Sequence, residues 1–175
     1  MFNRSKEQCV FCDTSMSGAD RPLQPGAMRR VASGLMTARV LSDICKDHGA
    51  PTCSLAVVQL HLNCVGFTAI APCVGNYPAV ESLWLERNKI LRVENLEALV
   101  ELRCLGLNNN LIERVQGVEH MKHLTMLNLS GNRLARLAGL DALKSLRILL
   151  VADNQLRTRA DVAHLEVGRC RLTPG

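Results

Sequence analysis

Aromatic residues are scarce in this 175-residue chain, since Phe, Tyr and Trp together make up 3% of it. An ordinary globular core relies more on aromatic side chains, because each of them buries a large area. Leucine is the dominant apolar residue instead, and it is spread along the chain. This composition favours a periodic architecture, and the length suits one domain plus a tail.

The N-terminus lacks the basic start, apolar stretch and small-residue cleavage site of an export leader. We therefore interpret the eight cysteines as reduced thiols of a cytoplasmic protein rather than as a disulfide framework. Residues 49–80 contain no Asp, Glu, Lys or Arg, but Pro51, Pro72 and several polar residues interrupt them. A membrane span needs about 20 predominantly apolar residues, so none is expected.

Charge of one sign is not concentrated anywhere in the sequence. The chain has 21 basic and 16 acidic residues, and no basic block occurs among them. Specific nucleic-acid binding normally shows a basic stripe or a recognisable module. We therefore do not expect a nucleic-acid partner.

Four segments align without a gap at a spacing of 22 residues. They read VESLWLERNKILRVENLEAL, LRCLGLNNNLIERVQGVEHM, LTMLNLSGNRLARLAGLDAL and LRILLVADNQLRTRADVAHL. Two apolar columns open the copies: Leu83, Leu105, Leu127 and Leu149, then Leu85, Leu107, Leu129 and Val151. One asparagine follows in every copy, at Asn88, Asn110, Asn132 and Asn154. Three more apolar columns complete each repeat.

Each column has a physical reason. The alternation in L-x-x-L-x-L is typical of a short strand with one buried face, and the later spacing of three suits a helical or 3₁₀ return. One coil cannot bury its own leucines, so the coils must stack. The sequence therefore predicts an α/β leucine-rich-repeat solenoid with a curved parallel sheet. The asparagine amides are predicted to form a structural ladder at the turns, because they both donate and accept.

A degenerate copy with Leu60, Leu62, Phe67 and Ile70 precedes the four repeats. The segment before it has apolar residues at roughly helical spacing, which predicts a capping helix over 36–48. The expected organisation is a disordered tail (1–35), a repeat domain (36–165) and a short irregular tail (166–175). Within the repeat domain we place the first repeat at 57–79 and the other four at 80–165. The last tail is too short for another coil, so either the chain is truncated or its last coil frays.

The segments MTARVLSDICKDHG, LHLNCVGFTAI, SLWLERNKI, VENLEALVELRCLGL and LNLSGNRL resemble the leucine-rich-repeat dynein axonemal assembly factor family over 36–165. That family has an MT…L…CK segment, an L-x-L-x-x-x-G-F strand and an LWLE repeat followed by IENLE. The resemblance implies a factor of the cytoplasm and the cilium that helps to preassemble axonemal dynein arms. It also implies dynein subunits or assembly chaperones as protein partners. Pro72 and Cys73 depart from the family pattern, and its later repeats are missing.

The outward strand residues form the predicted concave face, which solenoids use for binding. The candidate partner-binding residues are His61, Trp84, Glu86, Arg87, Asn108, Asn128 and Leu150. Trp84 is the only tryptophan, and aromatic residues of this kind dominate interface energetics. It is a candidate anchor for a partner, or it packs against the His61 coil. The alternative function is a regulatory subunit of an enzyme such as a protein phosphatase, acting through the same face.

No nucleophile elbow, phosphate-binding loop or HExxH motif occurs, so no catalytic residue is proposed. Cys9 and Cys12 form C-x-x-C, and Cys45 with His48 forms C-x-x-H, which are ligand types of a zinc site. The first pair lies in the tail expected to be disordered, and the second lies on the expected helix. We therefore predict a non-enzymatic protein without metal or other cofactor.

Overall fold

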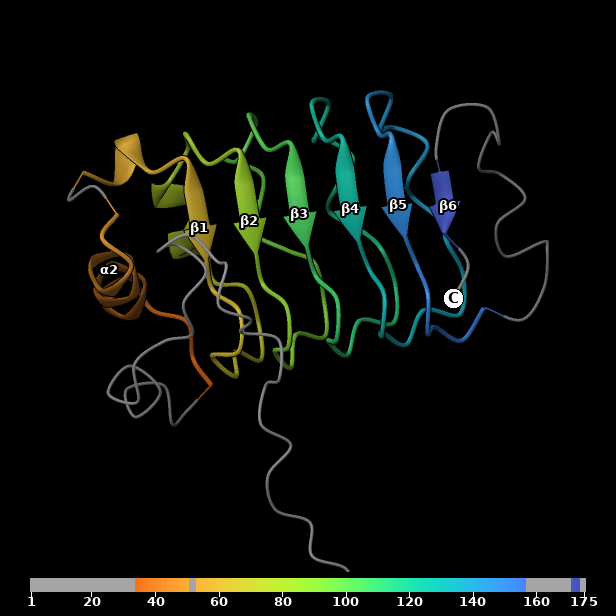
Figure 1. Cartoon of the computed structure of the whole chain (residues 1–175), viewed down its shortest axis with the longest axis horizontal. Coiled ribbons are helices and arrows are strands. Elements are labelled where there is room, and N and C mark those ends of the chain that lie inside the picture. Colours follow the sequence, from red (N-terminus) through yellow and green to blue (C-terminus); the bar gives the residue numbers. More distant parts are fainter. Residues whose placement is uncertain (1–33, 51–52, 157–170, 174–175) are drawn as a thin grey trace, which may run out of the picture.

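The computed structural model describes residues 34–50, 53–156 and 171–173, and the statements below concern these residues. Within them, six parallel strands stand side by side in chain order, and one α-helix lies beside the first strand (Figure 1). The elements are α2 (Ala38–Asp47), η3 (Ser54–Ala56), β1 (Gln59–His61), η4 (Pro72–Asn76), β2 (Ser82–Trp84), β3 (Cys104–Gly106), β4 (Met126–Asn128), β5 (Ile148–Leu150) and β6 (Arg171–Thr173).

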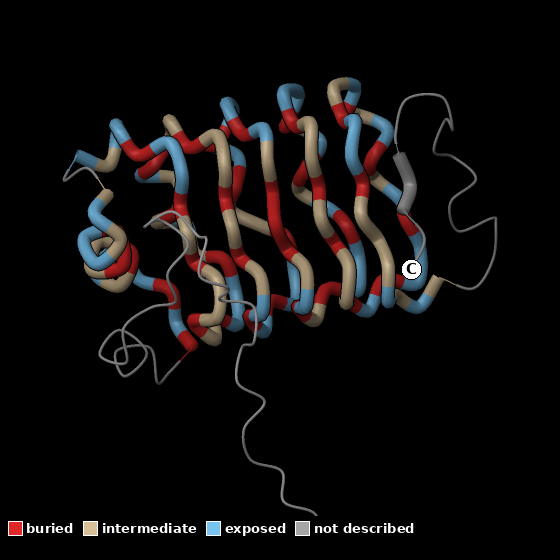
Figure 2. Tube along the Cα trace, viewed as in Figure 1, coloured by how far each residue is buried: buried red, intermediate tan, exposed pale blue. Residues whose placement is uncertain are grey.

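Each of the first five strands places a leucine in register with the leucine of the next coil. Leu60 is aligned with Leu83, and the register continues through Leu105, Leu127 and Leu149. These side chains are at most 1% exposed. Figure 2 shows buried residues recurring at the same level of successive coils. The predicted parallel-sheet solenoid is therefore confirmed, and its core is a continuous stack of leucines.

The chain turns out of the first five strands through one residue in the left-handed region. Its φ lies between 53° and 67° at Cys64, Arg87, Asn109, Gly131 and Asp153. This conformation costs about 1–2 kcal/mol for most side chains, but less for glycine, asparagine and aspartate. At Gly131 a Cβ would also come 2.5 Å from Oδ1 of Asn109. The turn therefore has a conformational cost that three of the five residues reduce.

The asparagine column links neighbouring coils. Oδ1 of Asn110 accepts from the N–H of Ile90 at 3.1 Å, and Nδ2 donates to the carbonyls of Leu85 at 2.9 Å and Leu107 at 3.0 Å. Asn132 and Asn154 repeat this pattern, in which Oδ1 accepts one backbone N–H and Nδ2 donates to carbonyls of two coils. Asn88 does the same, except that its Oδ1 accepts from both Gly66 and Phe67. In the first coil Val65 stands at the corresponding position and is 7% exposed. A valine suits this position because no preceding coil offers carbonyl and N–H groups for an amide to bridge.

Helix α2 covers the open end of the first coil. It begins after Thr37, whose hydroxyl accepts from the N–H of Val40 at 3.3 Å, and it ends at the C-cap His48. Its buried side chains are Leu41, Ile44 and Cys45. The helix lies within the predicted range 36–48, and it shields leucines that have no earlier coil to pack on.

Two parts of the chain differ from the expectations. In the three repeats whose returns are described, the chain returns through isolated turns, such as the one closed by the 2.9 Å bond from Leu99 N–H to the Leu96 carbonyl. Among the described returns, only that of the first coil contains a 3₁₀-helix, η4. Residues 171–173, expected to be irregular, form strand β6 instead, with Leu172 opposite Leu149. The edge of β5 has unpaired backbone groups that a further parallel strand satisfies, which explains the difference. The expected tail 1–35 lies outside the described residues, apart from its last two.

Candidate functional site

The strand face, defined here as the outward side chains of β1–β5 and of the residues that follow each strand, is the face expected to be concave. Its central row is in register across the coils. The row consists of His61, Trp84, Gly106, Asn128 and Leu150. The strands therefore bring together the residues that the sequence placed in this row, because the side chains of a strand alternate between its two faces.

An aromatic stack occupies the N-terminal part of the strand face. The ring centroids of His48 and His61 are 5.9 Å apart, and those of His61 and Trp84 are 6.5 Å apart, with planes inclined by less than 30° in both pairs. His48 comes from the end of α2, so the stack runs from the capping helix onto β2. Trp84 therefore packs on the His61 coil, as one of its two interpretations required, and it is still half-buried rather than covered.

Trp84 and Glu86 both lean over β3. A Cβ built on Gly106 would lie 2.6 Å from Cε3 of Trp84 and 2.7 Å from Oε1 of Glu86. Both atoms lie beside one point, so the ring edge and the carboxylate are neighbours. The missing side chain of Gly106 makes this arrangement possible, because any Cβ there would push one of the two groups away.

Among the in-register residues of the first five strands and the residue two positions after each of these strands, Glu86 is the only Asp, Glu, Lys or Arg. Burial raises the pKa of its carboxyl group, while its own backbone N–H and the charge of Arg87 lower it by less. Arg87 itself lies in the exposed left-handed turn after the strand. A half-buried carboxylate on a neutral surface is a point of negative charge for which solvation is incomplete.

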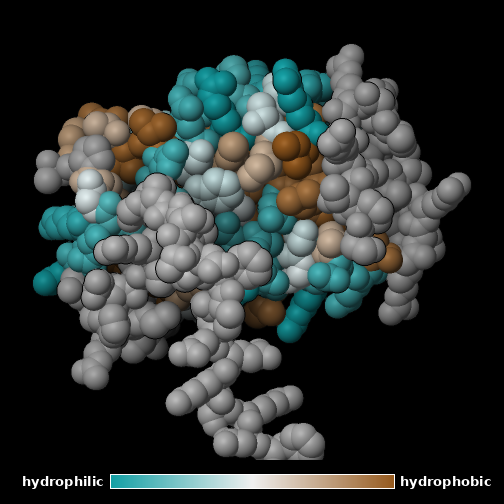
Figure 3. Space-filling view, in the orientation of Figure 1, coloured by the Kyte–Doolittle hydropathy of each residue, from teal (hydrophilic) through white to brown (hydrophobic). Residues whose placement is uncertain are grey.

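The C-terminal part of the strand face is apolar. Met126, Ile148 and Leu150 point outward from β4 and β5, and Ile148 is 43% exposed. Figure 3 shows this apolar surface beside a more polar region over β2 and β3. Sequence reasoning named only Leu150 of these three. The signal for the others was the column two residues before the central row, which contains Ser82, Cys104, Met126 and Ile148.

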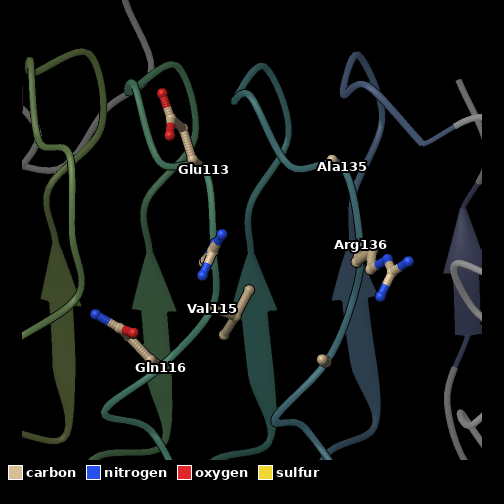
Figure 4. A pocket seen from close by; sticks show the side chains of 7 residues that line it. Glu113, Val115, Gln116, Ala135 and Arg136 are labelled. Carbon is tan, nitrogen blue, oxygen red and sulfur yellow. The ribbon is translucent and has the colours of Figure 1, made fainter.

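A groove on the opposite side of the coils has a different character. It has a volume of about 450 Å³ and lies between the return segments of two repeats (Figure 4). Its lining includes Glu113, Arg114, Gln116 and Arg136. These side chains carry charge of both signs. The lining contains no Ser, Thr, Cys or Lys side chain that Glu113 could activate as a nucleophile. The groove therefore has no arrangement for catalysis that resembles an enzyme site.

The candidate zinc ligands do not converge where they are described. Cys45 is buried beside Tyr77, and burial raises the pKa of its thiol, whereas His48 stacks on His61. Among the described residues, no three His, Cys, Asp or Glu side chains are grouped so that they would hold a metal ion. Cys9 and Cys12 lie outside the described residues. No helix in the described ranges is long and apolar enough to cross a lipid bilayer.

Solved structures share this architecture. A leucine-rich-repeat protein of Leptospira interrogans matches 68% of this chain over 31% of its own length, with a TM-score of 0.63 and 23% identity. Internalin C2 of Listeria monocytogenes matches 69% of this chain over 53% of its own, with a TM-score of 0.60 and 21% identity. The fold is that of a leucine-rich-repeat protein.

A third likeness is the leucine-rich-repeat ectodomain of a receptor kinase of Arabidopsis thaliana. It covers 67% of this chain and 68% of its own, with a TM-score of 0.53 and 24% identity. The chain spans about a third of the Leptospira protein and about half of the internalin. No family model and no curated protein sequence matches the chain. At these identities the likenesses establish the fold alone.

Proposed function

We propose that this leucine-rich-repeat protein is a non-enzymatic scaffold whose strand face binds a partner protein. The observation that carries the proposal is that one face holds both the half-buried Trp84 on β2 and, two and three strands further along, the outward apolar side chains of β4 and β5. Apolar side chains release water when a partner covers them, and tryptophan is among the residues most enriched in the few positions that carry most of the binding energy of an interface. The neutral character of the rest of the face suits a protein better than a polyanion.

The partner that we propose comes from the family resemblance of residues 36–165. The scaffold would act in the cytoplasmic preassembly of axonemal dynein arms and in the motile cilium, with dynein subunits or assembly chaperones as partners. The second candidate is a regulatory subunit of an enzyme such as a protein phosphatase. It would use the same strand face, so the identity of the bound protein separates the two.

Affinity purification from motile-ciliated cells tests the proposal. Wild-type protein should recover dynein heavy chains or their chaperones, and Trp84→Ala should lose about tenfold or more of this recovery, because it removes a large apolar contact. Leu91→Ala is the matched control, since Leu91 is 51% exposed and lies on the return side of the coil. Recovery of a phosphatase catalytic subunit instead would favour the second candidate. Equal recovery by the wild type and the folded Trp84→Ala variant would refute binding through this face.

A further inference from the structure

Two acceptor groups, the Glu86 carboxylate and the side-chain oxygen of Asn108, lie in adjacent coils of the strand face. Within the described residues, no Lys or Arg makes a salt bridge with Glu86, although the pair of Arg103 and Glu81 shows that such bridges form elsewhere on this sheet, at 3.3 Å. Asn108 occupies the next position in the same row, and its Oδ1 is buried without a hydrogen-bond partner in the described part of the chain. A buried acceptor without a donor costs free energy.

The same place also offers an aromatic ring. Trp84 stacks on His61, and its ring edge lies beside the Glu86 carboxylate over Gly106. A cation gains from the face of a tryptophan, and more when water is excluded. A carboxylate next to a tryptophan ring, with the backbone of a glycine beneath them, is therefore electrostatically complementary to a positive side chain.

We propose that the Glu86 site, made of Trp84, Glu86, Gly106 and Asn108, binds an arginine side chain of the partner protein. The guanidinium stacks on the Trp84 ring and donates to the Glu86 carboxylate, with further donors for the nearby acceptors. Arginine suits the site better than lysine, because its planar group stacks on aromatic rings and donates in a fork to carboxylates. This inference rests on the proposed function and specifies the chemistry of the partner.

The apolar part of the strand face determines what accompanies the arginine. Trp84 is on β2 and Leu150 is on β5, three strand spacings away. Adjacent strands are about 4.8 Å apart and an extended chain advances about 3.3 Å per residue, so the separation corresponds to roughly four residues. A segment bound in an extended conformation would therefore place a large apolar residue about four positions from the arginine.

Selection from a library of random displayed peptides tests the inference. The wild-type chain should enrich peptides that contain arginine and an apolar residue at this spacing, whereas Glu86→Gln should enrich the apolar residue without arginine. A selected peptide is then synthesised with arginine or with citrulline, which has a similar shape but no charge. Trp84 is the only tryptophan, so intrinsic fluorescence measures binding at the site.

The expected result is a coupling between the two charges. Glu86→Gln should weaken binding of the arginine peptide about tenfold and leave binding of the citrulline peptide nearly unchanged. The difference between the two effects is the interaction that a double-mutant cycle isolates. An equal effect on both peptides would overturn the inference. The Glu86→Gln variant should fold at neutral pH at least as stably as the wild type, because burial disfavours the charged form of Glu86.

Failure of the inference and failure of the proposed function give different results. Binding to Trp84→Ala is measured by calorimetry, because this variant has no tryptophan. Enriched peptides that lack arginine but bind Trp84→Ala more weakly than wild type would refute the arginine site and leave the strand face as the binding surface. Peptides that bind wild type and Trp84→Ala equally would refute both. Selection without any enriched peptide would likewise count against both.

Discussion

Replacement of Asn110 by alanine tests the physical role of the asparagine ladder. Asn110 is 4% exposed and makes bonds to Ile90, Leu85 and Leu107. The Leu85 carbonyl also accepts from Asn88 at 2.9 Å, and the Leu107 carbonyl also accepts from Asn132 at 2.9 Å. Each carbonyl therefore keeps one donor in the variant.

The N–H of Ile90 has no second acceptor among the described residues, so the substitution leaves it buried and unpaired. An orphaned buried group costs about 1–3 kcal/mol, and each weakened carbonyl adds about 0.5 kcal/mol, so we expect a loss of about 3 kcal/mol. In a chain of this size this lowers the melting temperature by about 10 °C.

The assay is thermal and urea unfolding followed by circular dichroism, with Asn154→Ala as the control. Asn154 makes the same kinds of bond, including one from the Leu134 N–H at 3.0 Å, but it is partly exposed. Water replaces the lost bonds there, so we expect a loss of about 1 kcal/mol. Equal losses in the two variants, or no loss at Asn110, would refute the reasoning about stranded groups.

Two further predictions concern backbone geometry and titration. Gly117→Ala should lower the free energy of unfolding, measured in urea, by about 3 kcal/mol, because φ is +73° and a Cβ would lie 2.9 Å from the Val93 carbonyl oxygen. Gly49→Ala is the control: its φ is +67°, but a Cβ there meets open space, so the loss should be only about 1 kcal/mol. Equal losses in the two variants would contradict the steric argument. Burial, with the nearby Cys45 thiol, raises the pKa of Tyr77 to about 12 from an ordinary 10.0. The neutral phenol is thus favoured in the folded state, so its contribution to stability is complete below pH 10 and declines as the pH rises towards 12. Absorbance of the single tyrosine should show this late titration, Tyr77→Phe should remove the corresponding pH dependence of unfolding, and a midpoint near 10 would be inconsistent with burial.

The sequence predicted the repeat framework well because a stack of identical coils is nearly a one-dimensional object. A spacing of 22 residues places Leu105 on Leu83 and Leu127 on Leu105 without any knowledge of other contacts. Strand β6 was missed although Leu172 lies 23 residues after Leu149, which is the step that also separates Leu60 from Leu83.

The candidate site was less accessible to sequence reasoning. Register predicted that Trp84 and Glu86 point outward, and this follows from strand alternation alone. It did not predict that both lean over Gly106, because that depends on the space left by a glycine of the next coil. It also considered His48 only as a metal ligand, whereas the end of α2 places its ring on His61.

By itself, the sequence determined which residues are buried and in which order the coils stack, because evenly spaced leucines are all buried only when each coil packs on the next one in the chain. Only the tertiary structure decided how the outward side chains meet one another. Those contacts depend on rotamers and on the size of neighbours that are 22 residues apart, such as Trp84 and Gly106. The burial and the neighbours of Glu86, on which the proposed recognition of arginine depends, exist only once two coils lie side by side.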